Sequence, residues 1–423
     1  MNANALALFP LLIAFLMFPL AAKLVLRFAP VSWRPALFAV VNIALALSLA
    51  GVAASKGVRL KEVRTFLPIG AGFCLLYLGL VGLQYLNLVV GRRRSGAWAW
   101  IGVAYPLVLL ALLKYVPSHW NPLQHLLGRF PDKVVPEFFL GLSYMAFRLS
   151  HMVYEVRNGI AAWPSIWEFL SFAFFVPTFS IGPINPFSRF QKSLAEGMPG
   201  GVAGPALLRI AVGAAKYLLV ANLFNQLSWH GLLFDGHPHK LIDMVVASLA
   251  YCVFLYGNFS GYCDMAIGVS ALLGISVMEN FNDPFLARNI QEFWNRWHIT
   301  LSTYMRDMMF TPLSKSLVRR FGPKMANHCI ALSIFAVFVV VGVWHGAGWN
   351  FFLFGVWNGI GLVACHYYSA FLKRRLSKQA WAAYHSNRWI HAVGVVVTFV
   401  YFSAGLALVA NNLPQLGTIF QMV

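Results

Sequence analysis

The chain has 423 residues, of which 59% are hydrophobic and only 11% are Asp, Glu, Lys or Arg, and its mean hydropathy is +0.68. Because soluble globular domains carry about 25% charged residues, a folded body of this size cannot cover its surface in water, and lipid must cover part of it. The net charge of +19 also occurs in nucleic-acid-binding proteins, but here the basic residues lie between apolar runs, as in Arg92–Arg94 and Lys373–Arg375. Basic residues next to membrane spans bind anionic headgroups and determine the orientation of the chain. The expected partner is therefore the lipid bilayer, and no nucleic acid is expected.

The predicted elements are membrane-spanning helices, because a bilayer core requires about 20 apolar residues per helix. The first apolar stretch lacks a basic leading region, so we expect it to be a span and not a cleaved signal peptide. About eleven candidate spans meet the length rule, and in chain order they cover residues 5–26, 35–55, 66–90, 97–116, 136–154, 165–183, 204–228, 241–274, 328–349, 351–372 and 389–411. The run 241–274 is long enough for one tilted helix or for a helix with a re-entrant piece.

The predicted fold is therefore an all-α, polytopic membrane protein. No internal repeat or linker marks a second domain, so residues 1–423 are expected to form one membrane-embedded domain. Within it we distinguish peripheral amino-terminal helices (1–130), a catalytic core (136–373) and a carboxy-terminal helix (389–411).

Residues 264–307 break the apolar pattern. Five of the 13 acidic residues lie there, together with Arg288, Arg296, Arg306 and His298. Charges at membrane depth are costly and usually face a cavity or each other. This stretch is therefore the first candidate for a functional site.

The segment 292–308 has the periodicity of an amphipathic helix. Asn289 is placed to cap it, with Glu292 three positions later as in a capping box. At about 100° per residue, one face carries Phe293, Trp297, Leu301, Tyr304 and Met308. The polar side and its edges carry Glu292, Asn295, Arg296, His298, Thr300, Ser302, Thr303, Arg306 and Asp307. The mixture of acids, arginines and a histidine favours a buried or re-entrant helix that lines a polar cavity, and a helix lying on the membrane surface is the alternative.

His345 is a second candidate, at the end of an apolar run in the sequence Trp344-His345-Gly346-Ala347-Gly348-Trp349. A lone histidine in such a run is usually a packed core residue. However, glycines at 342, 346 and 348 allow a backbone or a ligand to approach closely, and two tryptophans frame the site. Desolvation lowers the pKa of an imidazole and keeps it able to accept a proton, so a general base is the functional interpretation.

Two other kinds of chemistry lack support in the sequence. No G-x-S-x-G pattern indicates a serine nucleophile, and direct transfer from a thioester needs none. A metal site at His298 and His345 lacks a third ligand at a motif spacing, so no metal is expected.

Five stretches of sequence together resemble the membrane-bound O-acyltransferase family: Gly257–Gly268, Glu279–Phe285, Glu292–Ser302, Arg306–Asp307 and Trp344–Gly346. The likeness extends over most of the chain from about residue 136 onward, and the run E-F-W-x-R-W-H followed by W-H-G about 45 residues later is highly specific. The resemblance implies a ring of transmembrane helices around a thinned centre, with funnels from both faces.

The resemblance also implies site residues. His345 would be the catalytic histidine and His298 the second histidine of the site. Residues in or near the matched motifs that would bind or position substrate are Asp264, Asn280, Asn295, Arg296, Ser302, Arg306, Asp307, Trp344 and Trp349.

The function implied is transfer of a small acyl group to a hydroxyl of an extracytoplasmic cell-envelope polymer, or to a partner transferase. The donor would be a thioester on the cytoplasmic face, either on the phosphopantetheine of a small acyl carrier protein or as acyl-CoA, and no tightly bound cofactor is expected. A multi-pass protein of the bacterial cytoplasmic (inner) membrane fits this activity. Phe285–Arg288 resembles D-alanyl transfer proteins, whereas Ser260–Gly268 and Thr311–Leu313 resemble alginate O-acetylation proteins, so the acyl group stays open. A transporter or channel for an activated group, or a scaffold for a partner acyltransferase, are the alternatives.

Overall fold

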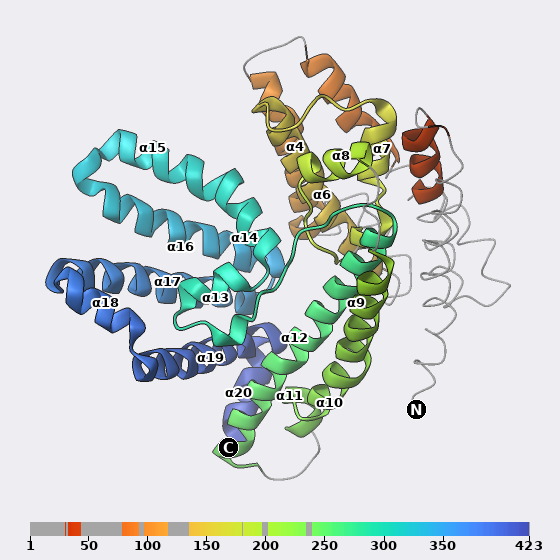
Figure 1. Ribbon diagram of the computed structural model, residues 1–423. Helices are drawn as coiled ribbons and strands as arrows, with labels where there is room; N and C mark the ends of the chain where they lie inside the picture. Colours follow the sequence, from red (N-terminus) through yellow and green to blue (C-terminus); the bar gives the residue numbers. More distant parts are fainter. Residues whose placement is uncertain are drawn as a thin grey trace. The chain divides into compact units, whose positions relative to one another are not determined.

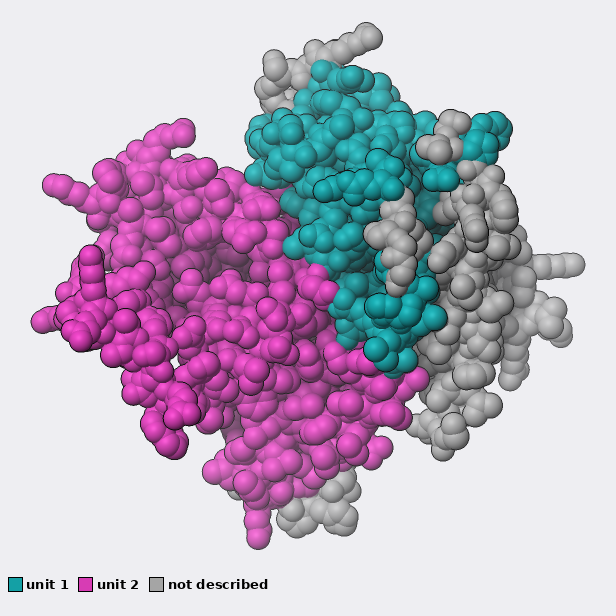
Figure 2. All heavy atoms as spheres, in the orientation of Figure 1, with its two compact units in different colours: residues 1–211, 263–278 teal, residues 212–262, 279–423 magenta. Residues whose placement is uncertain are grey.

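The computed structural model describes residues 30, 33–43, 78–92, 97–116, 135–179, 181–196, 202–233 and 239–422. The predicted span 5–26 and parts of the spans 35–55 and 66–90 lie outside the described residues. Regular structure in the described residues is helical, apart from one isolated bridge between Phe281 and Trp297. The chain divides into two compact units, shown in different colours in Figure 2: unit 1 comprises residues 1–211 and 263–278, and unit 2 comprises residues 212–262 and 279–423. That the whole chain is one domain stays a prediction.

Five helices of the described part are long and apolar enough to cross a membrane: Ala203–Gln226, Leu241–Leu272, Pro323–His345, Trp349–Arg375 and Arg388–Ala410. They correspond to predicted spans, and the run 241–274 is one helix, α12 (Leu241–Leu272). The polytopic helical membrane fold is thus confirmed, whereas the count of eleven spans is not.

The predicted span 165–183 is wrong as a single helix. Its residues form α7 (Ile166–Ala173), with a complete capping box between Ser165 and Glu168, and then a short 3₁₀ helix, η2 (Val176–Thr178). Pro177 lies inside the predicted span and has no N–H to donate, so an α-helix cannot continue through it without losing a hydrogen bond.

Unit 1 is built around α4 (Ala97–Tyr115), which packs against α6 (Val135–Arg157). The buried carboxylate of Glu155 on α6 accepts hydrogen bonds from the backbone N–H groups of Phe187 and Ser188, and so holds the start of α8 (Phe187–Glu196). Phenylalanine rings fill the interior of this unit: Phe38, Phe169, Phe172, Phe175, Phe187 and Phe190.

The span 203–226 runs through α9 (Ala203–Ala215), the π-helical turn η3 (Lys216–Val220) and α10 (Ala221–Gln226). Within unit 2, α12 crosses this span at two glycines. A Cβ on Gly261 would lie 2.6 Å from the carbonyl oxygen of Gly213, and a Cβ on Gly257 would lie 3.3 Å from that of Lys216. Only glycine allows this approach of the two backbones at Gly261.

The rest of unit 2 consists of the short helix α11, which precedes α12, and of a succession of helices from η4 onward. Figure 1 shows α16 and α17 side by side, and the two form an antiparallel hairpin that turns at residues 346–348. The elements in chain order are α11 (Trp229–Leu232), η4 (Pro284–Leu286), α13 (Ile290–Arg296), α14 (Ile299–Met305), η5 (Arg306–Phe310), α15 (Thr311–Phe321), η6 (Pro323–Met325), α16 (Ala326–His345), α17 (Trp349–Arg375), α18 (Lys378–Ser386), α19 (Arg388–Ala410) and α20 (Leu413–Met422).

The core of unit 2 is aromatic and holds α13 against α17 and α19. Phe293 lies with its ring centroid 4.0 Å from that of Phe402 on α19. The indole N–H of Trp294 donates to the side-chain oxygen of Asn358 on α17, at 3.2 Å. The short helix α13 is therefore fixed by ring packing on one side and by a buried hydrogen bond on the other.

Candidate functional site

The predicted continuous helix over 292–308 is broken at His298. Helix α13 ends at Arg296 and α14 begins at Ile299. His298 lies between them in the left-handed region, with φ 47° and ψ 50°. Non-glycine residues rarely adopt positive φ, and the hydrophobic periodicity of the sequence does not reveal this conformation. The predicted cap is confirmed, because the side chain of Asn289 accepts a hydrogen bond from the N–H of Glu292 at 2.8 Å.

Asn280 holds this break in place through both its main chain and its side chain. Its carbonyl oxygen accepts the N–H of Ile299 at 3.0 Å. Its side-chain Oδ1 accepts the N–H of Thr300 at 3.2 Å and the hydroxyl of Thr300 at 2.9 Å. The same Oδ1 lies 3.1 Å from Nδ1 of His298. The prediction of Asn280 as a substrate-binding residue is untested, and the contacts give it a positioning role.

These contacts fix the tautomer of His298. A backbone N–H can only donate, so the Asn280 atom that faces Thr300 must be the oxygen and not the amide nitrogen. An amide oxygen can only accept, so the Nδ1 of His298 must carry the proton. The other ring nitrogen, Nε2, therefore presents a lone pair, and among the described residues it has no hydrogen-bond partner.

His298 is buried, and its imidazole is kept neutral. Burial lowers the pKa of His298 to about 3, and the positive charge of His345 acts in the same direction. Phe259 of α12 covers the ring edge-on, with centroids 4.8 Å apart. The two predicted histidines are therefore close enough to interact electrostatically, and a proton on His345 works against a second one on His298.

His345 is the last residue of α16 and its side chain is exposed. Its ring lies 4.7 Å from the ring of Trp344 and 5.9 Å, edge-on, from that of Phe354 on α17. Phe354 in turn accepts a hydrogen bond from Asn358, the partner of Trp294. Trp294 and Phe354 also belong to one buried cluster, so packing around α17 connects the ends of α13 and α16, where the two histidines lie.

The glycines around His345 serve the hairpin. A Cβ on Gly342 would lie 2.4 Å from the carbonyl oxygen of Phe351 and 2.7 Å from the Cα of Gly355. A Cβ on Gly346 would lie 2.1 Å from the ring of Phe351. The prediction of close approach is confirmed, and the approaching groups belong to α17 of the same chain.

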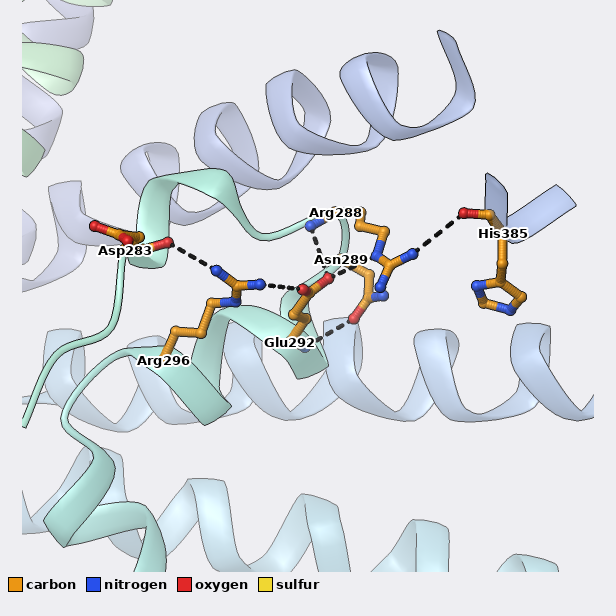
Figure 3. A network of polar contacts seen from close by, with 6 residues as sticks. All are labelled: Asp283, Arg288, Asn289, Glu292, Arg296 and His385. Atoms are coloured by element: carbon orange, nitrogen blue, oxygen red, sulfur yellow. Dashed lines mark hydrogen bonds and ion pairs between the residues drawn. The ribbon is translucent and has the colours of Figure 1, made fainter. Parts of the chain in front are cut away.

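Asn295 and Arg296 lie on the polar side of α13. Figure 3 shows Arg288 and Arg296 reaching the carboxylate of Glu292 from opposite sides, at 3.0 and 2.7 Å. Burial raises the pKa of Glu292, but hydrogen bonds from the backbone and side chain of Arg288 and from Arg296 outweigh it and hold that pKa below its ordinary value. Asn295 lines a surface pocket of about 380 Å³ beside this network.

The other predicted site residues of unit 2 contact residues close to them in the sequence. The hydroxyl of Ser302 donates to the carbonyl oxygen of Trp294 at 3.0 Å, which braces the break between α13 and α14. Arg306 and Asp307 lie 3.5 Å apart in the π-helical turn η5, and Arg306 is exposed. Trp349 is 72% exposed and contacts Phe352 edge-on.

Asp264 belongs to unit 1, apart from the other predicted residues. Its carboxylate forms an ion pair at 3.0 Å with Arg209 of α9. Both side chains are more than half-buried, so this pair links α9 and α12 within that unit. Its prediction as a substrate-binding residue is untested.

Three contributors to the site were not predicted from the sequence: Thr300 as a partner of Asn280, Asn358 as the partner of Trp294, and Phe259 as the ring that covers His298. Asn358 lies 64 positions from Trp294 along the chain. An asparagine within an apolar span was the one available signal, because a buried amide requires partners.

Comparison with known proteins connects this geometry to a family. The sequence model of MBOAT, the membrane-bound O-acyltransferase family, matches residues 99–404, which include both histidines. The chain is 31% identical over 324 residues to the teichoic acid D-alanyltransferase of Streptococcus thermophilus, covering 73% of this chain and 74% of that protein. It is 28% identical over 311 residues to the probable alginate O-acetylase AlgI of Pseudomonas aeruginosa (69% of this chain, 56% of that protein). It is 33% identical over 233 residues to the peptidoglycan O-acetyltransferase of Helicobacter pylori (53% of this chain, 42% of that protein).

Proposed function

The chain belongs to the membrane-bound O-acyltransferase family, and on that premise we propose that it moves a D-alanyl or acetyl group from a thioester donor to a hydroxyl of a cell-envelope polymer. As a member of the family it is a multi-pass membrane enzyme that transfers acyl groups. Relatives named for teichoic acid, alginate and peptidoglycan support a polymer acceptor. The proposed location is the bacterial cytoplasmic membrane, with the donor on the cytoplasmic face and the acceptor on the outer face.

His345 is the proposed general base. It takes the proton of the acceptor hydroxyl as that oxygen attacks the thioester carbonyl carbon, which forms a C–O bond and a tetrahedral oxyanion. Collapse of this intermediate breaks the C–S bond, and the proton on His345 passes to the leaving sulfur, so that an ester and a thiol are released. General base catalysis of this kind contributes about 10² to 10⁴ in rate.

His298 is proposed to accept a hydrogen bond and not to store the proton. With a pKa of about 3 it stays neutral near pH 7, so it is a poor base but a fixed acceptor. Its Nε2 lone pair would orient an N–H or O–H group of the substrates beside His345. The observation that carries this proposal is the Oδ1 of Asn280, which accepts an obligatory backbone donor and therefore leaves His298 only one neutral tautomer.

The donor is proposed to be a substrate that leaves after each turnover, either the phosphopantetheine thioester of a small acyl carrier protein or acyl-CoA. Trp344, beside His345, is proposed to pack around the reacting groups. Arg296 and Ser302 are proposed to position the site and not to bind substrate. The guanidinium group of Arg296 already bonds to Glu292 and Asp283, and the hydroxyl of Ser302 bonds to Trp294.

Transfer in vesicles tests this function. The purified protein in vesicles receives labelled D-alanyl and acetyl thioesters of a carrier protein and of CoA in parallel, and mass analysis of added envelope polymers identifies the ester formed. We expect His345→Ala to lower the rate at least 10²-fold while the protein stays monodisperse. His391→Ala, which removes an exposed histidine at the start of α19, serves as the matched control and should stay within twofold of the unaltered protein. Transfer by His345→Ala at the control rate would exclude the proposed base.

A further inference from the structure

A surface pocket of unit 2 is lined by residues of α13, α17 and α18, and neither His298 nor His345 is among them. Its volume is about 380 Å³, and its polar lining includes Asn289, Asn295, Ser369 and Lys373, with Trp381 as an aromatic wall. Ligand pockets of this kind begin at about 300 Å³. The reaction proposed above makes no use of it.

The lining carries an excess of positive charge. Of its lining residues, Arg288 and Lys373 are basic and Glu292 is acidic. The carboxylate of Glu292 binds the guanidinium groups of Arg288 and of Arg296, which does not itself line the pocket, at 3.0 and 2.7 Å (Figure 3), so these three side chains have a net charge of about +1 at neutral pH. Lys373 adds a further charge, and among the described residues no carboxylate pairs with it. Its ammonium group lies 5.7 Å from the ring centroid of Trp381, which keeps it at the pocket. An anion is therefore the complementary ligand.

The position of the pocket along the chain indicates where that anion comes from. The span of α17 ends at Arg375, and the span of α19 begins at Arg388. Helix α18 (Lys378–Ser386) connects them, and its Trp381 and His385 line the pocket. Two membrane spans that end together at basic residues and tryptophans mark the level of lipid headgroups.

We propose that this pocket binds the phosphate of an anionic membrane phospholipid such as phosphatidylglycerol. Lys373 contacts the phosphate, and the side-chain amides of Asn289 and Asn295 donate to its oxygens or to the glycerol hydroxyls. Because α13 ends two residues before His298, a bound headgroup braces the helix that leads to the site. This inference is independent of the acyl group and of the direction of transfer.

Lipid titration with native mass spectrometry tests the proposal on the full chain in detergent. Phosphatidylglycerol and phosphatidylcholine with the same acyl chains are compared on the unaltered protein, Lys373→Gln, Lys373→Arg and Lys378→Gln. Lys378 is exposed at the start of α18 and does not line the pocket, so its variant is a control of equal charge change.

We expect the unaltered protein to prefer phosphatidylglycerol. Lys373→Gln should weaken that binding about fivefold, the effect of one basic residue near a charged headgroup. Lys373→Arg should retain the affinity, and Lys378→Gln should stay within twofold. Equal binding of both lipids, or equal losses in Lys373→Gln and Lys378→Gln, would overturn the proposal. Displacement of the lipid by coenzyme A would also overturn it, because the pocket would then belong to the acyl donor.

Discussion

At the scale of single residues, Asn280 determines how His298 can act. One side-chain oxygen receives three donors, two from Thr300 and one from His298. The backbone N–H of Thr300 fixes the orientation of the Asn280 amide. The Asn280 oxygen then requires that the proton of His298 be on Nδ1. Asn280 was predicted as part of a motif, but its role depends on contacts with residues 18 and 20 positions away, which no local pattern encodes.

Substitution of Asn280 separates its structural role from its electrostatic one. Asn280→Ala leaves buried donors of Thr300 and His298 without a partner, and we expect the free energy of unfolding to fall by about 2–4 kcal/mol. Asn280→Asp keeps the acceptor but adds a negative charge, which should raise the pKa of His298. Thermal unfolding in detergent and transfer rates as a function of pH measure the two effects. Unchanged stability of Asn280→Ala would contradict the positioning role of Asn280.

The buried, neutral His298 also predicts a pH dependence of stability. Its pKa is about 3 in the folded chain against an ordinary value of 6.5. Between these values the unfolded chain binds a proton that the folded chain does not. The stability from this group is therefore complete above pH 6.5 and decreases with falling pH, by up to about 1.4 kcal/mol per pH unit. His298→Gln should flatten the dependence of the unfolding temperature between pH 7.5 and 5, whereas His391→Gln should keep it. Parallel curves for the two variants would contradict burial of a neutral histidine.

At the scale of elements, the amphipathic character of 292–308 was predictable, and so was its cap at Asn289. Phe293, Trp297, Leu301 and Tyr304 are buried as their spacing predicts. The break was not predictable, because a single residue with positive φ does not interrupt the hydrophobic period enough to be seen. Thr300 and His298 were placed on the edges of the polar face, yet both are buried through their bonds to Asn280.

The glycines of the α16–α17 hairpin also show what the sequence alone could not predict. Their spacing predicted close approach, but a sequence does not say whether a ligand or a neighbouring helix approaches. The structure places Gly342 against the backbone of Phe351 and Gly355. The position of His345, three residues beyond Gly342, therefore depends on helix packing.

Gly342→Ala tests this dependence. The added methyl group would lie 2.4 Å from the carbonyl oxygen of Phe351, and overpacking of this kind costs about 1–3 kcal/mol. We expect a lower unfolding temperature and a lower transfer rate, because the hairpin must open beside His345. Gly417→Ala is the matched control, since no heavy atom lies within 4 Å of its Cβ, and it should stabilise α20 by up to about 1 kcal/mol. Equal stability of the two variants would contradict the prediction, because it would show that α16 and α17 can move apart at Gly342 without a loss of stability.

At the scale of the whole molecule, composition was sufficient to predict a membrane protein. Apolar side chains along one face of α19 are exposed, among them Val393, Val396, Val397 and Val400. Their spacing of three and four residues forms a continuous stripe, and a stripe of this kind on an apolar span is the surface that lipid covers. The number of spans was less predictable, because an apolar run can be divided into short helices, as the run 165–183 is divided into α7 and η2 at Pro177.

Nitrogen-15 NMR of the intact, histidine-labelled protein in lipid tests the state of the site directly. The chain has 12 histidines, so the signal that disappears in His298→Gln identifies this residue. We expect the Nδ1–H tautomer, with an unprotonated Nε2, and no titration of that signal between pH 8 and 5. An Nε2–H tautomer, or titration near pH 6.5, would contradict both the positioning of His298 by Asn280 and the proposal that His345, and not His298, is the base.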